Sequence, residues 1–320
     1  RIRPPGAAIR MLECLAAVAG FLVFPNQTLP QDTLARISGY FGSGMLAARH
    51  SVHPEAVHAN VLRLSNVHRH GIHGVGPQWH SDGSFERRVF SHVLFHAQRM
   101  PPAGGGTDFA DLHAAYASLS TQEKEDWMRL ASVNAYSGAV HPLVHTHPVS
   151  GRRVLFLHLG QTGAIIQWPS RVGVGFQGEF MGLEAMNPSA GPKLSLGHRI
   201  LDAAEAARVM RTFNAMLMKH HSTYTYRIDR SLGDGDLILV DNLAAAHRAT
   251  PEAHDSSNGL RILHRTTVQG TRTLDPPPVS GLPPFAYIWG RNPLGDGGVW
   301  QGSDYYGAGF YWNSSLVMRN

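Results

Sequence analysis

Apolar residues recur at two different spacings along the chain, and each spacing predicts one kind of element. An apolar residue at every third or fourth position is typical of an amphipathic helix. Ser120 followed three residues later by Glu123 forms a capping box, which marks the start of a helix. Together these signals predict helices over residues 8–20, 30–41, 111–119, 121–133 and 202–219.

Short apolar runs bounded by Gly, Pro or Asn predict buried strands between the helices. Residues 66–78, just before Trp79, are rich in Gly and His without periodicity and predict a loop. The predicted strands cover residues 21–24, 61–65, 90–97, 154–158, 224–227, 237–240 and 260–268. With 34 glycines and 20 prolines as well, the sequence favours a mainly β fold with flanking helices.

Most of the chain is predicted to form one domain. A length of 320 residues with 43% hydrophobic residues suits a single large core, assigned here to residues 1–275. Within it, residues 167–198 combine Gly, Pro and Met with little periodicity and predict a lid-like insertion over a cleft. Residues 276–320 are rich in Pro, Gly, Trp and Tyr and are interpreted as an extension packed on the same domain.

The charge pattern argues against nucleic acid as a partner. The formal net charge is +5, but Lys and Arg are scattered and form no basic run. Small anionic substrates fit this mild surplus better. No stretch holds 18 or more consecutive apolar residues, so no membrane span is expected.

The single cysteine, Cys14, excludes an intramolecular disulfide and favours a reducing compartment. Its apolar neighbours predict a buried helix position. We therefore expect a soluble cytoplasmic or organellar protein, which could form a homo-oligomer. The chain begins at Arg1 without a methionine, so a targeting segment upstream would not be visible here.

His80 and Asp82 are the first candidates for chemistry. Side chains two residues apart share a face of a strand, and with a distant histidine such a pair can form the 2-His-1-carboxylate set of non-haem iron oxygenases. The chain has 20 histidines, so a His-x-Asp could also arise by chance. The hypothesis gains weight from His247, just past a buried strand, and from Arg261 farther along.

Arg261 suits a second task, the binding of a dicarboxylate. A guanidinium pairs with a carboxylate through two parallel hydrogen bonds, and the hydroxyl of Thr107 can add another donor. Taken alone, Arg261 could equally be an ordinary surface arginine. The order His80-x-Asp82, a long gap, then His247 and Arg261 is the more specific observation.

From about residue 8 to residue 270 the chain resembles the taurine dioxygenase family of Fe(II)- and 2-oxoglutarate-dependent oxygenases. This group includes the 2,4-D-degrading dioxygenases and the alkylsulfatases. Short motifs in the expected order carry the resemblance. They lie at residues 20–27, 79–85, 102–111, 141–148, 235–242, His247 and 261–265.

The resemblance implies a distorted double-stranded β-helix, a jelly-roll or cupin-like fold, with helices packed outside. It implies that His80, Asp82 and His247 bind Fe(II), and that Thr107 and Arg261 hold the distal carboxylate of 2-oxoglutarate. The implied reaction uses dioxygen to hydroxylate a C–H bond of a small molecule, releases succinate and CO2, and can be supported by ascorbate.

The substrate pocket is the least determined part of the implied site. Arg265 is expected to meet an anionic group of the substrate, and an internal salt bridge, for example to Asp241, is the alternative. Gln161 and Asn66 are expected to line the same pocket. The candidate substrates are sulfonates, sulfate esters, aryloxy acids and amino or carboxylic acids.

Three residues depart from the family pattern. Gly76 stands where taurine users have an asparagine, Gln161 where an aromatic residue walls the pocket, and His145 where an arginine is usual. These departures argue against taurine as the substrate. Two other classes of function stay open: a non-catalytic binding protein on the same fold, and a zinc-dependent hydrolase that uses the same three ligands.

Overall fold

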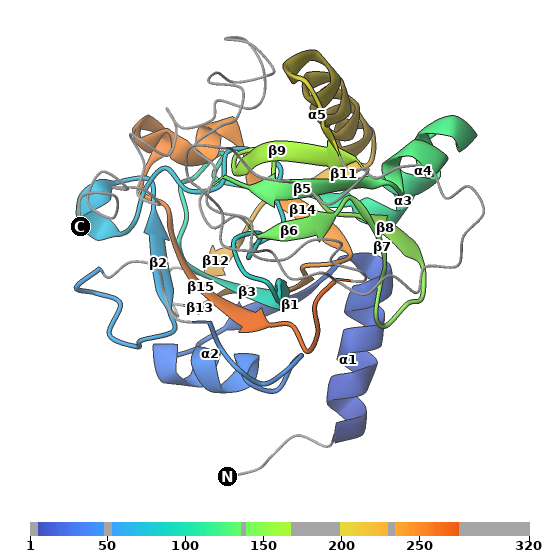
Figure 1. Ribbon diagram of the computed structural model, residues 1–320. Helices are drawn as coiled ribbons and strands as arrows, with labels where there is room; N and C mark the ends of the chain where they lie inside the picture. The colour runs from blue at the N-terminus through green and yellow to red at the C-terminus, as the bar shows by residue number, and fades with distance from the viewer. Residues whose placement is uncertain (1–5, 48–52, 136–138, 168–198, 230–233, 275–320) are drawn as a thin grey trace, which may run out of the picture.

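The computed structural model describes residues 6–47, 53–135, 139–167, 199–229 and 234–274. Within these residues the largest sheet is antiparallel (Figure 1), and its strands run in the order β1-β13-β3-β15-β2, with β12 added beside β13. Neighbours in this order lie far apart in the sequence, so the sheet joins both ends of the domain. The strands are β1 (Phe21–Gln27), β2 (Leu62–Ser65), β3 (Phe90–Arg99), β12 (Ile228–Asp229), β13 (Asp234–Asp241) and β15 (Ile262–Gln269).

A second layer of strands covers the inner face of this sheet. Val93 and Phe95 of β3 and Val240 of β13 pack in one buried cluster with Phe109 of β4 and Ala245 of β14. The smaller sheets have the orders β11-β4-β14, β10-β9-β5-β6 and β7-β8. Their strands are β4 (Thr107–Asp111), β5 (Leu130–Asn134), β6 (Val140–Pro142), β7 (Val144–Thr146), β8 (Arg153–Leu155), β9 (Thr162–Gln167), β10 (Arg199–Ile200), β11 (His221–Tyr224) and β14 (Ala245–Ala249).

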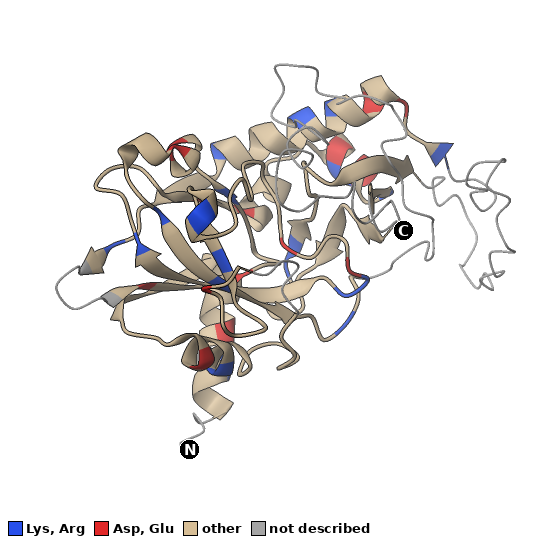
Figure 2. Ribbon diagram, turned by 90° about the vertical axis from the view of Figure 1, so that its left-hand side faces the viewer, with Lys and Arg blue, Asp and Glu red and all other residues tan. Residues whose placement is uncertain are grey.

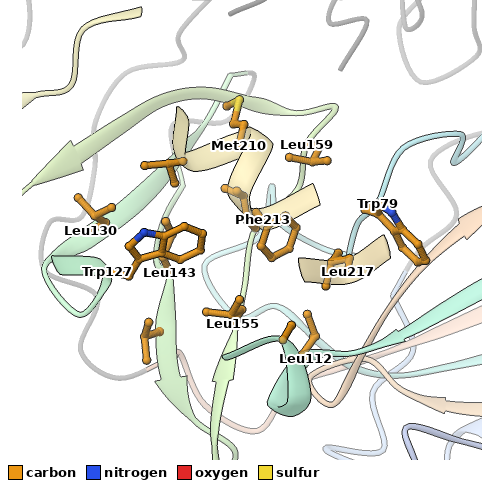
Figure 3. Packing of buried hydrophobic residues seen from close by; sticks show 14 of the residues in the cluster. Trp79, Leu112, Trp127, Leu130, Leu143, Leu155, Leu159, Met210, Phe213 and Leu217 are labelled. Carbon is orange, nitrogen blue, oxygen red and sulfur yellow. The ribbon is translucent and has the colours of Figure 1, made fainter. Parts of the chain in front are cut away.

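Helices close the two outer sides of the β layers (Figure 1). On the large sheet, Leu94 and Leu239 face outward and pack with Ala16 of α1 (Gly6–Ala19) and Leu34 of α2 (Gln31–Ser38). The other side carries α3 (Leu112–Ala117), α4 (Thr121–Trp127) and α5 (Ala203–Lys219), with the apolar cluster of Figure 3 beneath them. Three short 3-10 turns, η1 (His68–His70), η2 (Pro251–His254) and η3 (Ser256–Asn258), lie in loops.

The apolar cluster of Figure 3 anchors the segment that carries the first candidate ligands. Trp79 is fully buried in that cluster beside Leu217 of α5. Its carbonyl accepts a hydrogen bond from the backbone of Leu159, and the Arg248 guanidinium lies 4.6 Å from its ring centroid. His80 follows directly, so its backbone is fixed by the packing of its neighbour.

The prediction of a mainly β fold with flanking helices is confirmed, while several element assignments were wrong. The predicted helix 121–133 ends at Trp127, and Leu130–Asn134 form strand β5 instead. All five of those residues are buried and pair with β9 and β6, so sheet pairing overrides the helical pattern. Strands β9 and β14 were not predicted at all.

Cys14 is exposed rather than buried, because α1 turns Ala16 and Ala17 inward and leaves Cys14 toward solvent. Among the described residues, no helix is both long and apolar enough to cross a membrane. Lys and Arg are distributed over several elements in Figure 2. The predicted extension 276–320 and residues 168–198 of the predicted lid lie outside the described residues.

Candidate active site

His80, Asp82 and His247 come together in the interior, between the large sheet and the three-stranded sheet. Their ligand atoms all lie within 4.8 Å of one another, and all three side chains are buried. Nε2 of His80 is 3.8 Å from Oδ1 of Asp82, and Nε2 of His247 is 3.7 Å from Oδ2 of Asp82. Three donor atoms at these separations can contact one ion.

Backbone pairing holds the two histidines against each other. The amide of His80 donates to the carbonyl of His247 (3.1 Å), and the amide of His247 donates to the carbonyl of His80 (2.8 Å). Their rings are 4.3 Å apart between centroids. His80 lies in this single bridge and not in a regular strand, so the expected strand around it is absent.

The His80 ring is oriented by a neighbouring carbonyl. Its Nδ1 lies 2.7 Å from the carbonyl oxygen of Gln78 and donates to it, which leaves Nε2 as the lone-pair nitrogen. Burial lowers the pKa of His80, although the carboxylate of Asp82 acts in the opposite direction. The ring is therefore neutral near pH 7 and can ligate a metal ion.

Asp82 is positioned by Asn242, which no strand alternation would have indicated. The backbone amide of Asp82 donates to Oδ1 of Asn242 (2.8 Å), and Nδ2 of Asn242 donates to the carbonyls of Asp82 (2.9 Å) and Phe90 (2.7 Å). Asn242 is fully buried. It therefore fixes the turn that carries Asp82 with hydrogen bonds in both directions.

The carboxylate of Asp82 stays ionised. Burial alone would raise the pKa of Asp82, but Arg265, His247 and His80 together lower it to about 2. Nη1 of Arg265 donates to Oδ1 of Asp82 over 3.0 Å. Oδ2 of Asp82 has no hydrogen-bond partner among the described residues, although it is buried.

His247, like Asp82, has buried polar atoms without hydrogen-bond partners. Neither of its ring nitrogens has a hydrogen-bond partner among the described residues, although both are buried. Burial and the neighbouring His80 lower the pKa of His247 to about 3, so its ring is neutral. Buried polar atoms are normally paired, so the unpaired atoms of His247 and Asp82 fit a metal ion between them.

Gly76 lies directly against this cluster. Its φ is +72°, a conformation that disfavours any residue with a side chain. A Cβ at this position would lie 2.9 Å from Cε1 and 3.4 Å from Nε2 of His80. Glycine therefore lets the backbone approach the His80 ring more closely than any other residue could.

A second group of polar side chains contains Arg261, Thr107 and Tyr226. The Arg261 guanidinium is buried, and Nε donates to the carbonyl of Gly105 (2.8 Å) while Nη2 is 3.4 Å from Oγ1 of Thr107. Burial lowers the pKa of Arg261, with the nearby Tyr226 acting the other way. Arg261 forms no ion pair with any described carboxylate.

The two groups are connected by strand register. His247 of β14 pairs with Phe109 of β4, and Ala249 pairs with Thr107. Directly paired residues and residues two positions apart share a face, so His247 and Thr107 lie on the same face. Two residues of strand separate them, about 7 Å.

The predicted substrate residues are placed less simply. Arg265 has the internal salt bridge that was the alternative, but its partner is Asp82, whereas Asp241 contacts His147 (3.1 Å). The buried Oε1 of Gln161 accepts hydrogen bonds from Ser84 and from Asn134.

Asn66 lies against the backbone that leads into Arg261. Its Oδ1 accepts from the amide of Arg261 (2.8 Å), and its Nδ2 donates to the carbonyls of Asp255 and Gly259. The side chain thus supports Arg261 by holding the preceding loop. Its assignment to the substrate pocket stays a prediction.

Sequence reasoning did not identify Asn242, Tyr226 or His158 as site residues. Asn242 is the last residue of the motif at residues 235–242. The available sequence signal was an amide side chain directly after Asp241, at the end of an apolar run. The ring of His158 is 5.0 Å from that of His80, and burial lowers the pKa of His158 well below its usual value. In the sequence His158 only ended an apolar run.

The comparison with known families decides the class of this site. Residues 7–267 match the sequence model of the family described as taurine catabolism dioxygenase TauD, TfdA family. This chain belongs to that family. Several of its relatives are named alpha-ketoglutarate-dependent dioxygenases, a class of oxidoreductases, and alpha-ketoglutarate is another name for 2-oxoglutarate.

Two relatives illustrate the extent of the match. The alpha-ketoglutarate-dependent 2,4-dichlorophenoxyacetate dioxygenase of Burkholderia sp. (strain RASC) is 26% identical over 283 residues, 83% of this chain and 87% of that protein. A Schizosaccharomyces pombe protein, provisionally named alpha-ketoglutarate-dependent sulfonate dioxygenase, is 30% identical over 169 residues, 46% of this chain. That match spans 43% of the yeast protein, less than half of its length.

The fold is shared with solved structures. A taurine dioxygenase from Burkholderia xenovorans has a TM-score of 0.61 and 21% identity, and the match covers 86% of this chain and 85% of that chain. At 21% identity, this likeness shows that the TauD/TfdA chain has the same fold as the taurine dioxygenase, and nothing further.

Proposed function

We propose that this TauD/TfdA chain is an Fe(II)- and 2-oxoglutarate-dependent dioxygenase that hydroxylates a C–H bond of a small anionic substrate. His80, Asp82 and His247 would hold the iron, and Thr107 and Arg261 the distal carboxylate of 2-oxoglutarate. The jelly-roll arrangement of the family is proposed with it, in keeping with two antiparallel layers around the cluster.

One observation carries the proposal. A buried guanidinium without a described carboxylate partner, Arg261, lies beside Thr107, and Thr107 shares a face with His247. An unpaired buried charge is costly, so an anion is expected there when the site is filled. About 7 Å of strand is a span that a five-carbon dicarboxylate can bridge between this anion site and the metal cluster.

The family match favours iron over zinc, because the donor set alone can bind either metal. Two neutral imidazoles and one carboxylate form the facial set used by non-haem Fe(II) oxygenases. When bound, iron supplies the oxidation by dioxygen, in which 2-oxoglutarate becomes succinate and CO2 and one oxygen atom enters the substrate C–H bond. The protein residues described here orient the ligands, exclude water and keep Asp82 ionised.

The substrate is proposed to carry a carboxylate or a sulfonate. The named relatives act on a chlorinated phenoxyacetate or are provisionally assigned to sulfonates, and both kinds of compound are anions. Arg265 would then have two tasks, to hold Asp82 and to present positive charge to the substrate.

A substrate screen tests the proposal. The protein would be incubated with Fe(II), 2-oxoglutarate, ascorbate and a panel of sulfonates, sulfate esters, aryloxy acids and amino acids. We expect succinate above the substrate-free background with at least one anionic compound, and a product that contains one atom from labelled dioxygen.

The rival functions give different results in the same assay. A zinc-dependent hydrolase would act with Zn(II) without oxygen uptake. A binding protein would release no succinate with any compound. Either outcome would contradict the proposed reaction.

A further inference from the structure

Tyr226 lies in the segment between β11 and β12, beside Thr107 and Arg261. These three residues are called the anion end of the site. The Tyr226 hydroxyl is 3.0 Å from Oγ1 of Thr107, and the guanidinium of Arg261 is 5.9 Å from the Tyr226 ring centroid. All three side chains are buried. Burial raises the pKa of Tyr226, so the hydroxyl keeps its proton.

The hydrogen-bond capacity of Thr107 and Tyr226 leaves one proton without an acceptor. A hydroxyl has one proton to donate and two lone pairs to accept with. If Arg261 and Tyr226 both donate to Thr107, the Thr107 proton must point elsewhere. If Thr107 donates to Tyr226 instead, the Tyr226 proton is the remaining one. No described residue accepts it in either arrangement.

We propose that Tyr226 is a positioning residue that joins Thr107 and Arg261 in one anion-binding group for the distal carboxylate of 2-oxoglutarate. The inference rests on the proposed function of the site and adds a third residue to it. Because the hydroxyls of Thr107 and Tyr226 are hydrogen-bonded to each other, one O–H group stays available to donate to the anion that Arg261 binds. The group would therefore distinguish a 2-oxo acid with a second carboxylate from one without it.

Tyr224 provides a matched control two residues earlier. Its hydroxyl donates to Oδ2 of Asp236 over 2.6 Å, so its proton is already used by a carboxylate of the protein. The Tyr224 and Tyr226 rings contact edge to face, with centroids 5.4 Å apart. Replacing either with Phe removes one hydroxyl from the same neighbourhood and keeps the ring.

The test measures binding of two 2-oxo acids, without turnover. Wild type, Tyr226→Phe and Tyr224→Phe would be loaded with Mn(II) and titrated calorimetrically under nitrogen with 2-oxoglutarate and with 2-oxopentanoate, which lacks the distal carboxylate. Tyr226→Phe should weaken 2-oxoglutarate binding by about 5- to 20-fold and change 2-oxopentanoate binding by less than about twofold. Tyr224→Phe should change neither.

Two results would overturn the inference: unchanged 2-oxoglutarate affinity in Tyr226→Phe, or an equal loss for both acids. Arg261→Gln separates this outcome from failure of the proposed function. If Arg261→Gln weakens 2-oxoglutarate binding but Tyr226→Phe does not, only the role of Tyr226 is wrong. If wild type does not bind 2-oxoglutarate, or Arg261→Gln binds it normally, the proposed cosubstrate site is wrong.

A second measurement covers the case in which Tyr226→Phe does not fold, which thermal unfolding would reveal. The tyrosine absorption band of the Mn(II)-loaded wild type should shift when 2-oxoglutarate is added and not when 2-oxopentanoate is added. Tyr224→Phe should retain this shift. The absence of a difference between the two acids would count against Tyr226.

Discussion

The metal end of the site (His80, Asp82 and His247) and its anion end are both buried, but their charges are balanced in different ways. At the metal end, Asp82 has the Arg265 guanidinium at 3.0 Å and two neutral histidines beside it. At the anion end, Arg261 forms no ion pair with a described carboxylate. The first region would hold a metal ion next to a carboxylate whose charge Arg265 already partly neutralises, whereas the second would take an anion from outside the protein.

This difference predicts separate responses to mutation. A change at the metal end should affect metal binding first, and 2-oxoglutarate binding only through the metal. A change at the anion end should leave metal binding intact. The following experiments test whether the two ends can be separated in this way.

The largest effect is expected from Asp82→Ala. The substitution removes one of the three proposed ligands and leaves Arg265 buried without that carboxylate, which is costly. Activity should fall by more than the roughly 10- to 100-fold typical of losing an outer-shell partner. Mn(II) binding, followed by electron paramagnetic resonance, should weaken steeply. Normal Mn(II) binding in Asp82→Ala would contradict the ligand assignment.

Arg261→Gln should have the next largest effect, and only at the anion end. Loss of a charge-assisted pair in a buried pocket costs about 2–4 kcal/mol, so the affinity for 2-oxoglutarate should fall about 30- to 900-fold. Mn(II) affinity, measured without 2-oxoglutarate, should stay at the wild-type value. A matching loss of Mn(II) affinity would show that the two ends are not independent.

Gly76→Ala should produce a smaller effect at the metal end. The new Cβ would lie only 2.9 Å from Cε1 of His80, and the alanine would have to keep the positive φ of Gly76. We expect Mn(II) affinity to fall about tenfold, since the ring of a ligand must move. Gly151→Ala is the control, because its φ is +69° but nothing lies within 4 Å of its Cβ. An equal loss in both variants would assign the effect to backbone strain alone.

The smallest effect is expected on the stability of the protein at acidic pH, and it involves histidines that belong to neither end of the site. Burial lowers the pKa values of His141 and His145 to about 4. In the unfolded chain a histidine titrates near 6.5, so the unfolded state binds more protons as the pH falls from about 6.5 to 4. The free energy of unfolding should therefore decrease through this window.

Thermal unfolding of the metal-free protein between pH 7 and pH 5 measures this effect. His141→Gln should give a shallower dependence on pH, because one titrating group is removed while an amide can still donate to the carbonyl of Ser84. An unchanged slope in His141→Gln would exclude that histidine as a source of the acid sensitivity.

The sequence predicted the helices best where one face alone is buried. Helix α5 matches its expected span almost completely, because its apolar residues repeat regularly and Asp202 with Glu205 caps its start. Strand β5 was mistaken for helix because local pattern cannot show which distant strands, here β6 and β9, will pair with it. The misassignment thus reflects non-local hydrogen bonding.

The same limit applies to the site. His80, Asp82, His247 and Arg261 could be selected because their chemistry and order are distinctive. Tyr226 could not be selected in this way, since its proposed role depends on the position of its hydroxyl beside Thr107, and the sequence around it predicted only an ordinary strand. Asn242 likewise became meaningful only through hydrogen bonds to the backbone of Asp82.

Asn242 also has a consequence for the order in which the protein folds. Its side chain joins the chain at Asp82 across 160 residues of sequence. Contacts at such separation form slowly, because a long loop must be closed before they contribute any stability. His80 and Asp82 would therefore be synthesised long before the third proposed ligand, His247, can join them. The proposed metal site is complete only after β13 and β14 have docked, so metal binding would depend on a late step of folding.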